Sequence, residues 1–180
     1  HLVIAGILFA IAIAVTHALA DDAAPASNKP ITPASKPPVW TSMFDGKKPD
    51  GWKDSNIGAV EPPTVTDGRL ELPMADGISS ITWQKEFPKS NYEIRLQAMR
   101  IEGNDFFCGL TFPVQKDHCS FIVGGWGGTV VGLSSIDGED AAHNATTRRE
   151  RFESGKWYSI RVRVTDHRIQ TWIDDKQMVD

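Results

Sequence analysis

Two long segments of the chain alternate between apolar and polar residues over most of their length. They are NYEIRLQAMRIE, residues 91–102, and WYSIRVRVTDHRIQTWIDD, residues 157–175. Successive side chains of a β-strand point to opposite faces, so a period of two predicts a strand with one face buried. Both segments are therefore predicted to form half-buried strands of an antiparallel sheet.

Shorter apolar runs fill most of the remaining sequence between these two segments and before them. They are VWTSMF (39–44), RLELP (69–73), ISSITWQKEF (78–87), DFFCGLTFPV (105–114), HCSFIVGG (118–125) and TVVGLSSID (129–137). Turn-forming dipeptides separate them: Asp45-Gly46, Asp67-Gly68, Asp76-Gly77, Gly103-Asn104 and Asp137-Gly138. Helical periodicity is weak, and its one candidate, residues 141–152, lacks a clean apolar stripe. Many short strands at near-regular spacing predict an all-β fold, an antiparallel β-sandwich of the jelly-roll type.

The two ends of the sequence differ in character from this β-rich part. Residues 2–15 form one apolar run, followed by Ala18-Leu19-Ala20, which predicts a signal peptide over residues 1–20. Residues 21–38 are rich in Pro, Ala and Ser and predict an extended linker. The jelly-roll domain is then expected over residues 39–180, with a closing strand missing after Asp180. The protein is expected to be periplasmic or secreted, without membrane attachment after cleavage.

Composition excludes one class of partner but does not decide whether the two cysteines form a disulfide. The formal net charge is −4 and the domain has no basic stripe, so nucleic acid is excluded as a partner. Cys108 and Cys119 fall on the two arms of one predicted hairpin. A disulfide needs them directly opposite each other, and two buried free thiols are the alternative.

Several motifs, in this order along the chain, resemble one known family. They are MFDGKKPDGWK (43–53), VTDGRLEL (65–72), the Gly-Trp-Gly segment around Trp126, and GKWYSIRVRV (155–164) with IQTWIDDKQMVD (169–180). The chain resembles the 3-keto-disaccharide hydrolase domain over residues 40–180. The resemblance implies a concanavalin A-like or laminin-G-like jelly roll in an exported bacterial protein. Typical members carry Asn-Ser-Gly before an apolar strand and an Arg, whereas residues 103–110 here read GNDFFCGL.

The reaction that this resemblance implies needs particular chemical groups. A carbonyl at sugar carbon 3 acidifies the hydrogen on carbon 2, and loss of that proton can expel the group on carbon 1. This route needs a general base, a stabiliser for the enolate oxygen and an acid. Direct hydrolysis instead needs two carboxyl groups. Asp105, Asp137 and His118 are the candidate catalytic residues. Hairpin pairing predicts Asp105 beside the Gly124–Trp126 segment, with His118 at the opposite end.

Other polar and aromatic residues are candidates for binding the sugar. Trp126 lies between two Gly-Gly pairs. They would either clear space for a pyranose ring on the indole, or form a β-bulge or a bend where two sheets approach, with the indole filling the gap. Glu139, His143 and Asn144 belong to the densest polar loop, and Arg95 lies on one face of a central strand.

No metal site and no organic cofactor are predicted; the acidic loop has oxygen ligands of the kind that Ca²⁺ prefers, but its spacing is not a full EF-hand pattern. Two functions follow. The first is an exported hydrolase that cleaves 3-keto-disaccharides or related oxidised glycosides, through elimination and hydration. The alternative is a non-catalytic laminin-G-like module that binds glycan or another surface partner.

Overall fold

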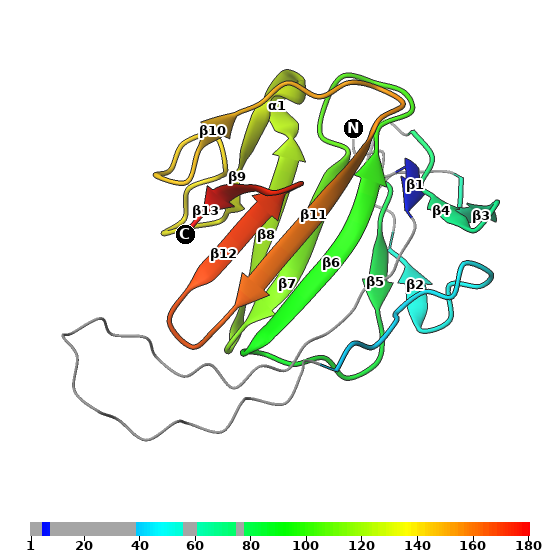
Figure 1. The fold of residues 1–180 in the computed structure, drawn as a ribbon, viewed down its shortest axis with the longest axis horizontal. Coiled ribbons are helices and arrows are strands. Elements are labelled where there is room, and N and C mark those ends of the chain that lie inside the picture. Colours follow the sequence, from blue (N-terminus) through cyan, green and yellow to red (C-terminus); the bar gives the residue numbers. More distant parts are fainter. Residues whose placement is uncertain (1–4, 8–38, 56–60, 75–77) are drawn as a thin grey trace, which may run out of the picture.

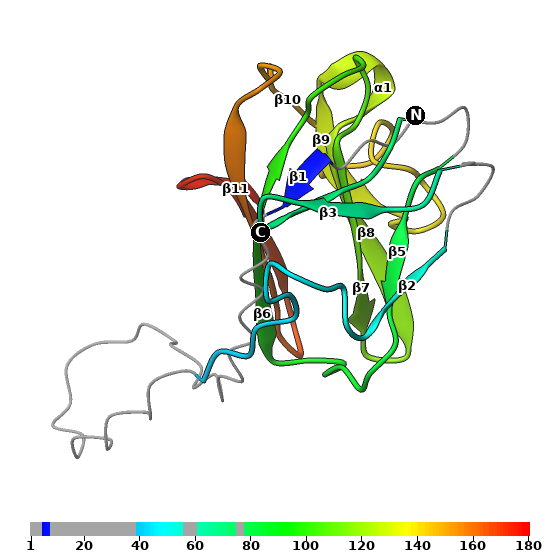
Figure 2. The same cartoon turned by 90° about the vertical axis from the view of Figure 1, so that its right-hand side faces the viewer.

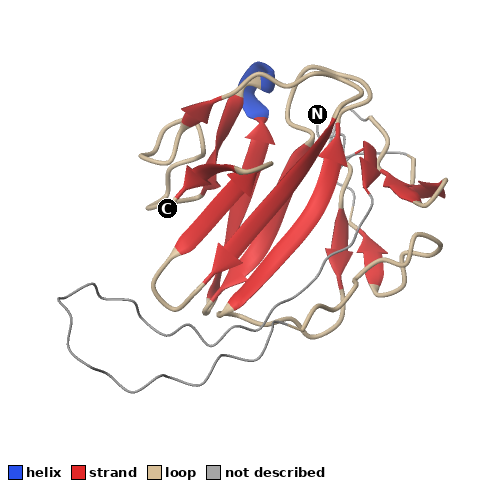
Figure 3. Cartoon of the chain, in the orientation of Figure 1, coloured by secondary structure: helices blue, strands red, loops and turns tan. Residues whose placement is uncertain are grey.

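The structure, a computed structural model, describes residues 5–7, 39–55, 61–74 and 78–180, and this part of the chain is almost entirely β (Figures 1 and 3). The strands are β1 (Ala5–Ile7), β2 (Trp52–Asp54), β3 (Thr64–Thr66), β4 (Arg69–Glu71), β5 (Ile81–Trp83), β6 (Tyr92–Met99), β7 (Cys108–Val114), β8 (Asp117–Gly124), β9 (Val130–Ser134), β10 (Arg148–Arg149), β11 (Trp157–Val164), β12 (Ile169–Ile173) and β13 (Lys176–Val179). A short turn labelled α1 (Gly125–Gly128), whose central residues Trp126 and Gly127 have non-helical backbone angles, joins β8 to β9. The predicted all-β antiparallel sandwich is confirmed.

The strands form two layers (Figure 2). One layer is a seven-stranded sheet in the order β13-β12-β11-β6-β1-β4-β3. The other contains a four-stranded sheet, β10-β9-β8-β7, and the antiparallel pair β2-β5 lies beside it (Figures 1 and 2). Within the described residues, β7 pairs only with β8, so its other edge faces the β2-β5 pair.

The core lies between the layers and follows from the alternation in the sequence. β6 and β11 pair over their full length, with Ile94 opposite Val162 and Leu96 opposite Ile160. These four side chains are at most 5% exposed. They meet buried residues of the other layer, among them Phe112, Phe121 and Val123. Apolar burial of this kind is the main favourable contribution to folding.

The turn that carries the four glycines has backbone angles that ordinary residues avoid. Gly124, Gly127 and Gly128 have φ of +74°, +81° and +95°, and Trp126 has φ +46°. A Cβ on Gly128 would come within 2.5 Å of the Asn104 carbonyl oxygen. Glycine is therefore required at position 128 because a neighbouring loop approaches the backbone closely.

One of the expected strands is not present. VWTSMF, residues 39–44, forms no strand, yet Met43 and Phe44 are each 5% exposed and belong to the core. This run is therefore apolar because two of its residues are buried in the core, although the run pairs with no strand. The weak helical candidate at residues 141–152 forms turns and the short strand β10.

The predicted signal peptide and linker lie outside the described residues, apart from β1. Ala5–Ile7 pairs with both β4 and β6. The leader and linker assignments stay predictions. Within the described part of the chain, no helix is long and apolar enough to cross a membrane.

Candidate functional site

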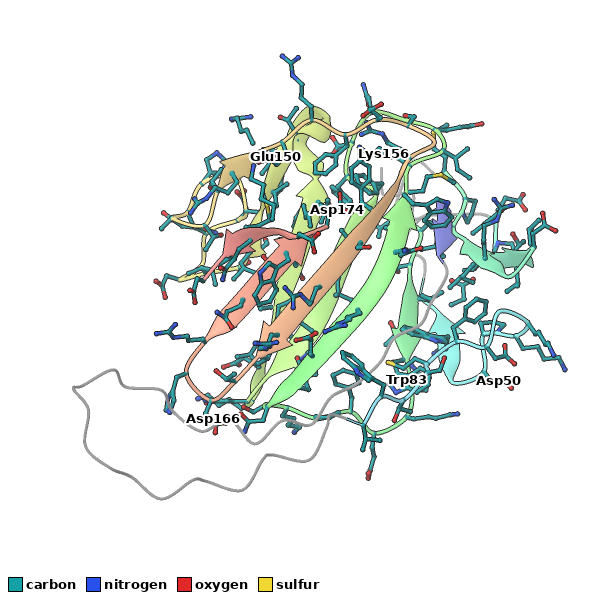
Figure 4. All side chains as sticks on the ribbon, in the orientation of Figure 1. Asp50, Trp83, Glu150, Lys156, Asp166 and Asp174 are labelled. Carbon is teal, nitrogen blue, oxygen red and sulfur yellow. The ribbon has the colours of Figure 1, made fainter. Side chains whose placement is uncertain are left out.

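A concave surface of the described residues is a groove along the free edge of β7, which we call the β7 groove. It has a volume of about 640 Å³. One wall comes from β7 and β8, and the other from β2, β5 and the residues around them. Ile94 and Leu96, on the inward face of β6, lie at its floor. Trp83 lies on this side of the molecule, away from Glu150 beside β10 (Figure 4).

Hydroxyl groups and aromatic rings form much of the groove wall. Thr111 on β7 and Ser120 on β8 are register partners, and their side-chain oxygens are 2.7 Å apart. On the opposite wall, the Ser55 and Thr82 side-chain oxygens are 2.8 Å apart. Hydroxyls can donate and accept, which suits the hydroxyl groups of a sugar.

Two tryptophans stand on the wall formed by β2 and β5. Trp52 and Trp83 are register partners, and their rings meet edge to face with centroids 5.1 Å apart. The indole nitrogen of Trp52 donates to the Met43 carbonyl oxygen at 2.8 Å, which fixes that ring. Indole rings combine an apolar face with a polar edge, as sugar-binding surfaces require.

The ionisable side chains among the described lining residues are Lys85, His118 and Cys108. The Lys85 ammonium lies 5.3 Å from the Trp83 ring centroid, a cation–π contact. His118 is exposed and is the register partner of Pro113. Burial raises the pKa of the Cys108 thiol to about 12, so this thiol is protonated at neutral pH. Lys85 and His118 are thus the groups of the groove available for acid–base or electrostatic chemistry.

The predicted relation between Asp105 and His118 is confirmed. The Asp105 side chain accepts hydrogen bonds from the backbone N–H of Gly127 at 3.0 Å and of Phe106 at 2.7 Å. Asp105 therefore lies against the turn that carries Trp126, while His118 lies near the β7–β8 turn. Both carboxylate oxygens of Asp105 hold backbone groups, and Asp105 does not line the groove.

Asp137 does not join Asp105. It lies in a tight turn after β9, between Ile136 and Glu139, which exchange two backbone hydrogen bonds. The antiparallel register of β8 and β9 carries the chain after β9 away from α1. Asp105, Trp126 and Asp137 therefore form no common pocket, and the role predicted for Asp137 gains no support from this placement.

The polar loop that follows is held by its own side chains. Asn144 donates to the carbonyl oxygens of Leu133 at 2.8 Å and of Asp140 at 2.7 Å, and accepts from the Thr146 hydroxyl at 2.6 Å. His143 Nδ1 lies 2.7 Å from an Asp140 carboxylate oxygen. Glu139, His143 and Asn144 do not line the groove. Their predicted contacts with substrate stay predictions.

Arg95 lines a different hollow, over β6 and β11 and beside the turn between β12 and β13. Its volume is about 960 Å³. Alternate residues of a strand face opposite sides, so Arg95 and the groove residue Ile94 point away from each other. Arg95 Nε and Arg163 Nε donate to the two carboxylate oxygens of Glu93 at 2.6 and 2.8 Å, and Arg95 lies 4.4 Å from the Trp40 ring centroid. Arg95 is thus separated from the β7 groove by β6.

Trp126 is 44% exposed on α1 and lies outside the β7 groove. Its glycine-rich segment is a turn between β8 and β9, closer to the predicted bend than to a β-bulge, but the indole is too exposed to fill a gap between sheets. Trp126 lines none of the described pockets. The described residues also contain no group of three or more His, Cys, Asp or Glu side chains that could hold a metal ion. Ca²⁺ binding is thus left without a defined ligand set.

The sequence reasoning missed Lys85 and the tryptophans of the β2-β5 pair. One signal could have found two of them. Trp83 and Lys85 are two residues apart in ITWQKEF, so an extended backbone places them on the same side. Thr111 and Ser120 carried no comparable signal, because isolated hydroxyl residues are common in strands.

An all-β sandwich with a groove lined by aromatic rings and hydroxyls is a fold and site suited to a sugar. The chain belongs to the 3-keto-alpha-glucoside-1,2-lyase-like domain family, whose model matches residues 39–180. Comparisons with curated proteins and with solved structures find no match. Family membership connects the protein to carbohydrate chemistry of the hydrolase or lyase type.

Proposed function

We propose that the protein cleaves 3-keto-disaccharides or related oxidised glycosides at the β7 groove, by elimination followed by hydration. The observation that carries this proposal is the set of ionisable lining groups. His118 and Lys85 line the groove, whereas no Asp or Glu does so among the described residues. Removal of a proton beside a carbonyl needs one base and a stabiliser for the oxyanion. Direct hydrolysis by paired carboxylates would need two acids that these lining residues do not include.

In this mechanism the neutral imidazole of His118 takes the proton from carbon 2 of the keto sugar. The electron pair moves to the carbon 3 oxygen, where the Lys85 ammonium and the hydroxyls of Thr111 and Ser120 stabilise the negative charge. Return of this electron pair forms the carbon 1–carbon 2 double bond and breaks the bond to the leaving oxygen. That oxygen takes the proton from the His118 imidazolium. Water then adds across the double bond, with its oxygen on carbon 1 and a proton on carbon 2.

The sugar ring is assigned to the part of the groove that contains Trp83 and the Thr111–Ser120 pair. Trp83 provides an apolar surface for one face of the ring, and the Thr111–Ser120 pair meets its hydroxyl edge. The reaction as written uses only groups of the chain, and we place it in the periplasm or outside the cell because of the apolar run at residues 2–15.

The test follows release of free sugar from 3-keto-trehalose and 3-keto-sucrose by the full chain. His118→Gln is expected to lower kcat by about 10²–10⁴-fold, the usual contribution of a general base. His167→Gln, the same substitution at an exposed histidine outside the groove, is the matched control and is expected to retain activity. Retention of full activity by His118→Gln would refute the assignment of the base.

Two further outcomes separate the alternatives. EDTA is expected to leave the rate unchanged, and a loss of activity would direct attention to the acidic loop around Asp137 and Glu139. No release of sugar from a folded chain would favour the second function, a non-catalytic module that binds glycan through the same hydroxyl and indole groups.

A further inference from the structure

The wall of the β7 groove that β7 and β8 form changes from polar to apolar along its length. The residues of β7 and β8 that point outward from the sandwich line it as successive register pairs: Pro113 with His118, Thr111 with Ser120, and Gly109 with Ile122. The middle pair is bonded through its hydroxyls. The next pair has only an apolar side chain and a glycine. A ligand lying along β7 therefore contacts hydroxyl groups at the Thr111–Ser120 pair and no hydroxyl of this wall at the next pair, Gly109 and Ile122.

The apolar end continues beyond the last of these pairs. Phe106 also lines the groove and is half-buried. Ile122 and Phe106 lie close together: a Cβ on Gly125 would come within 3.0 Å of Ile122 Cγ2 and 3.6 Å of Phe106 Cδ1. Leu110 packs against the core and faces the groove from the other side of β7. Phe106 and Ile122 thus form an apolar surface on the outward face of this wall, which we call the apolar end of the groove.

The spacing suits the two parts of a glycoside. One register step of two residues along a strand is roughly 7 Å, about the width of a pyranose ring. A sugar ring over Thr111 and Ser120 would therefore place the group on its carbon 1 over Gly109 and Ile122. A second sugar would bring several hydroxyls to the apolar end, and those that face Phe106 and Ile122 lose water without gaining a hydrogen bond. An alkyl or aryl group would instead bury its apolar surface there.

We propose that the β7 groove selects 3-keto-glucosides whose leaving group is apolar, an alkyl or aryl aglycone, over those whose leaving group is a second sugar. This inference rests on the proposed function, because it assigns the leaving-group half of the same site. The polar end holds the keto sugar and the apolar end holds the aglycone.

The experiment compares hexyl and methyl 3-keto-α-glucosides with the full chain. Both leaving groups are simple alkoxides of similar basicity, so the comparison isolates apolar contact from leaving-group chemistry. Burial of about two methylenes is worth at least roughly tenfold, so kcat/KM for the hexyl compound is expected to be about tenfold higher or more. 3-keto-trehalose is expected to be cleaved more slowly than the hexyl glucoside.

A variant tests which residues produce the preference. Ile122→Thr keeps a β-branched residue on the strand and introduces a hydroxyl, and it is expected to lower the hexyl-to-methyl ratio by roughly threefold to tenfold. A ratio of two substrates on one enzyme is insensitive to the fraction of protein that folds. Ile101→Thr is the control, since Ile101 is 45% exposed and lies outside the groove. Inhibition of methyl 3-keto-glucoside cleavage by unoxidised hexyl α-glucoside gives a second measurement that needs no variant.

The outcomes distinguish this inference from the proposed function. If both alkyl glucosides are cleaved with equal kcat/KM, or 3-keto-trehalose is cleaved faster than the hexyl compound, the preference for an apolar aglycone is wrong and the proposed function stands. If neither is cleaved, the proposed function fails, and calorimetric binding of hexyl and methyl α-glucoside decides the inference. Binding at least about tenfold tighter for the hexyl compound supports it, and equal affinity overturns it.

Discussion

The glycine-rich turn at α1 allows a test of the close contact between this turn and the loop between β6 and β7. The perturbation is Gly128→Ala, compared with Gly127→Ala one residue earlier. Both positions have positive φ, +95° and +81°. They differ in space, because a Cβ at 128 would lie 2.5 Å from the Asn104 carbonyl oxygen, whereas nothing lies within 4 Å of a Cβ at 127. The pair therefore separates backbone strain from a steric clash.

The expected magnitudes follow from these contacts. An alanine in the left-handed region costs roughly 1–2 kcal/mol, and Gly127→Ala is expected to lower the free energy of unfolding by about that amount. Gly128→Ala carries the same strain and must also displace a backbone group. That group belongs to the loop whose Asp105 carbonyl oxygen accepts from Arg100 Nη1, at 3.2 Å. The total loss is expected to reach about 3 kcal/mol or more.

Urea unfolding of the full chain, followed by tryptophan fluorescence and by circular dichroism, measures both variants. With an m-value of about 1–3 kcal/mol/M, the two midpoints should differ by roughly 0.5–2 M, at unchanged m. If the losses agree to within about 0.5 kcal/mol, the close approach of the Asn104 carbonyl does not constrain position 128. The reasoning from that contact would then be refuted.

Three further predictions concern a buried charge, a buried thiol and the exposed indole. Glu93→Gln is expected to lower the free energy of unfolding by about 1–2 kcal/mol, because Glu93 is 4% exposed and forms ion pairs with Arg95 and Arg163. The loss stays moderate because the two arginine side chains are 52% and 41% exposed and keep contact with water. A loss above about 3 kcal/mol in urea unfolding would show that water does not compensate these guanidinium groups. Burial raises the pKa of Cys108 to about 12, so iodoacetamide at about pH 8 should modify this thiol in unfolded but not in folded protein, as followed by mass spectrometry. Because the pKa of the Cys108 thiol is higher in the folded state, its contribution to the free energy of unfolding is fully present below the unfolded pKa near 9. This contribution falls as the pH rises from there toward 12. A free energy of unfolding that rises over this interval would contradict the assignment. Trp126→Ala is expected to change kcat/KM by less than about twofold, since the indole lies outside the groove, and a loss of about tenfold would restore its role as a sugar platform.

The alternation in the sequence predicted the two central strands correctly, because the period of two is a property of the extended backbone itself. Residues 92–99 and 157–164 became β6 and β11, with their apolar residues in the core. The turn dipeptides Asp67-Gly68 and Asp137-Gly138 have the positive φ expected of them. The same local logic placed Asp105 and His118 at opposite ends of one hairpin.

The two cysteines show a property that the local sequence pattern does not determine, the register of the hairpin. Both fall on the β7–β8 hairpin, as the sequence indicated, but pairing alone leaves the register open. The structure pairs Cys108 with Val123 and Cys119 with Phe112, so they are not opposite each other and both are free. Register depends on how both sheets pack their apolar faces, which is a property of the whole sandwich.

The sequence by itself determined the class of fold, the two central strands with their apolar faces, and several turns, because these properties depend on residues that are close together in the chain. Only the tertiary structure decided the composition of the β7 groove. Trp83 and Lys85 meet Thr111, His118 and Ser120 because the β2-β5 pair packs beside the edge of β7. That contact joins segments far apart in the sequence, and it is fixed by packing of the two layers rather than by any local pattern.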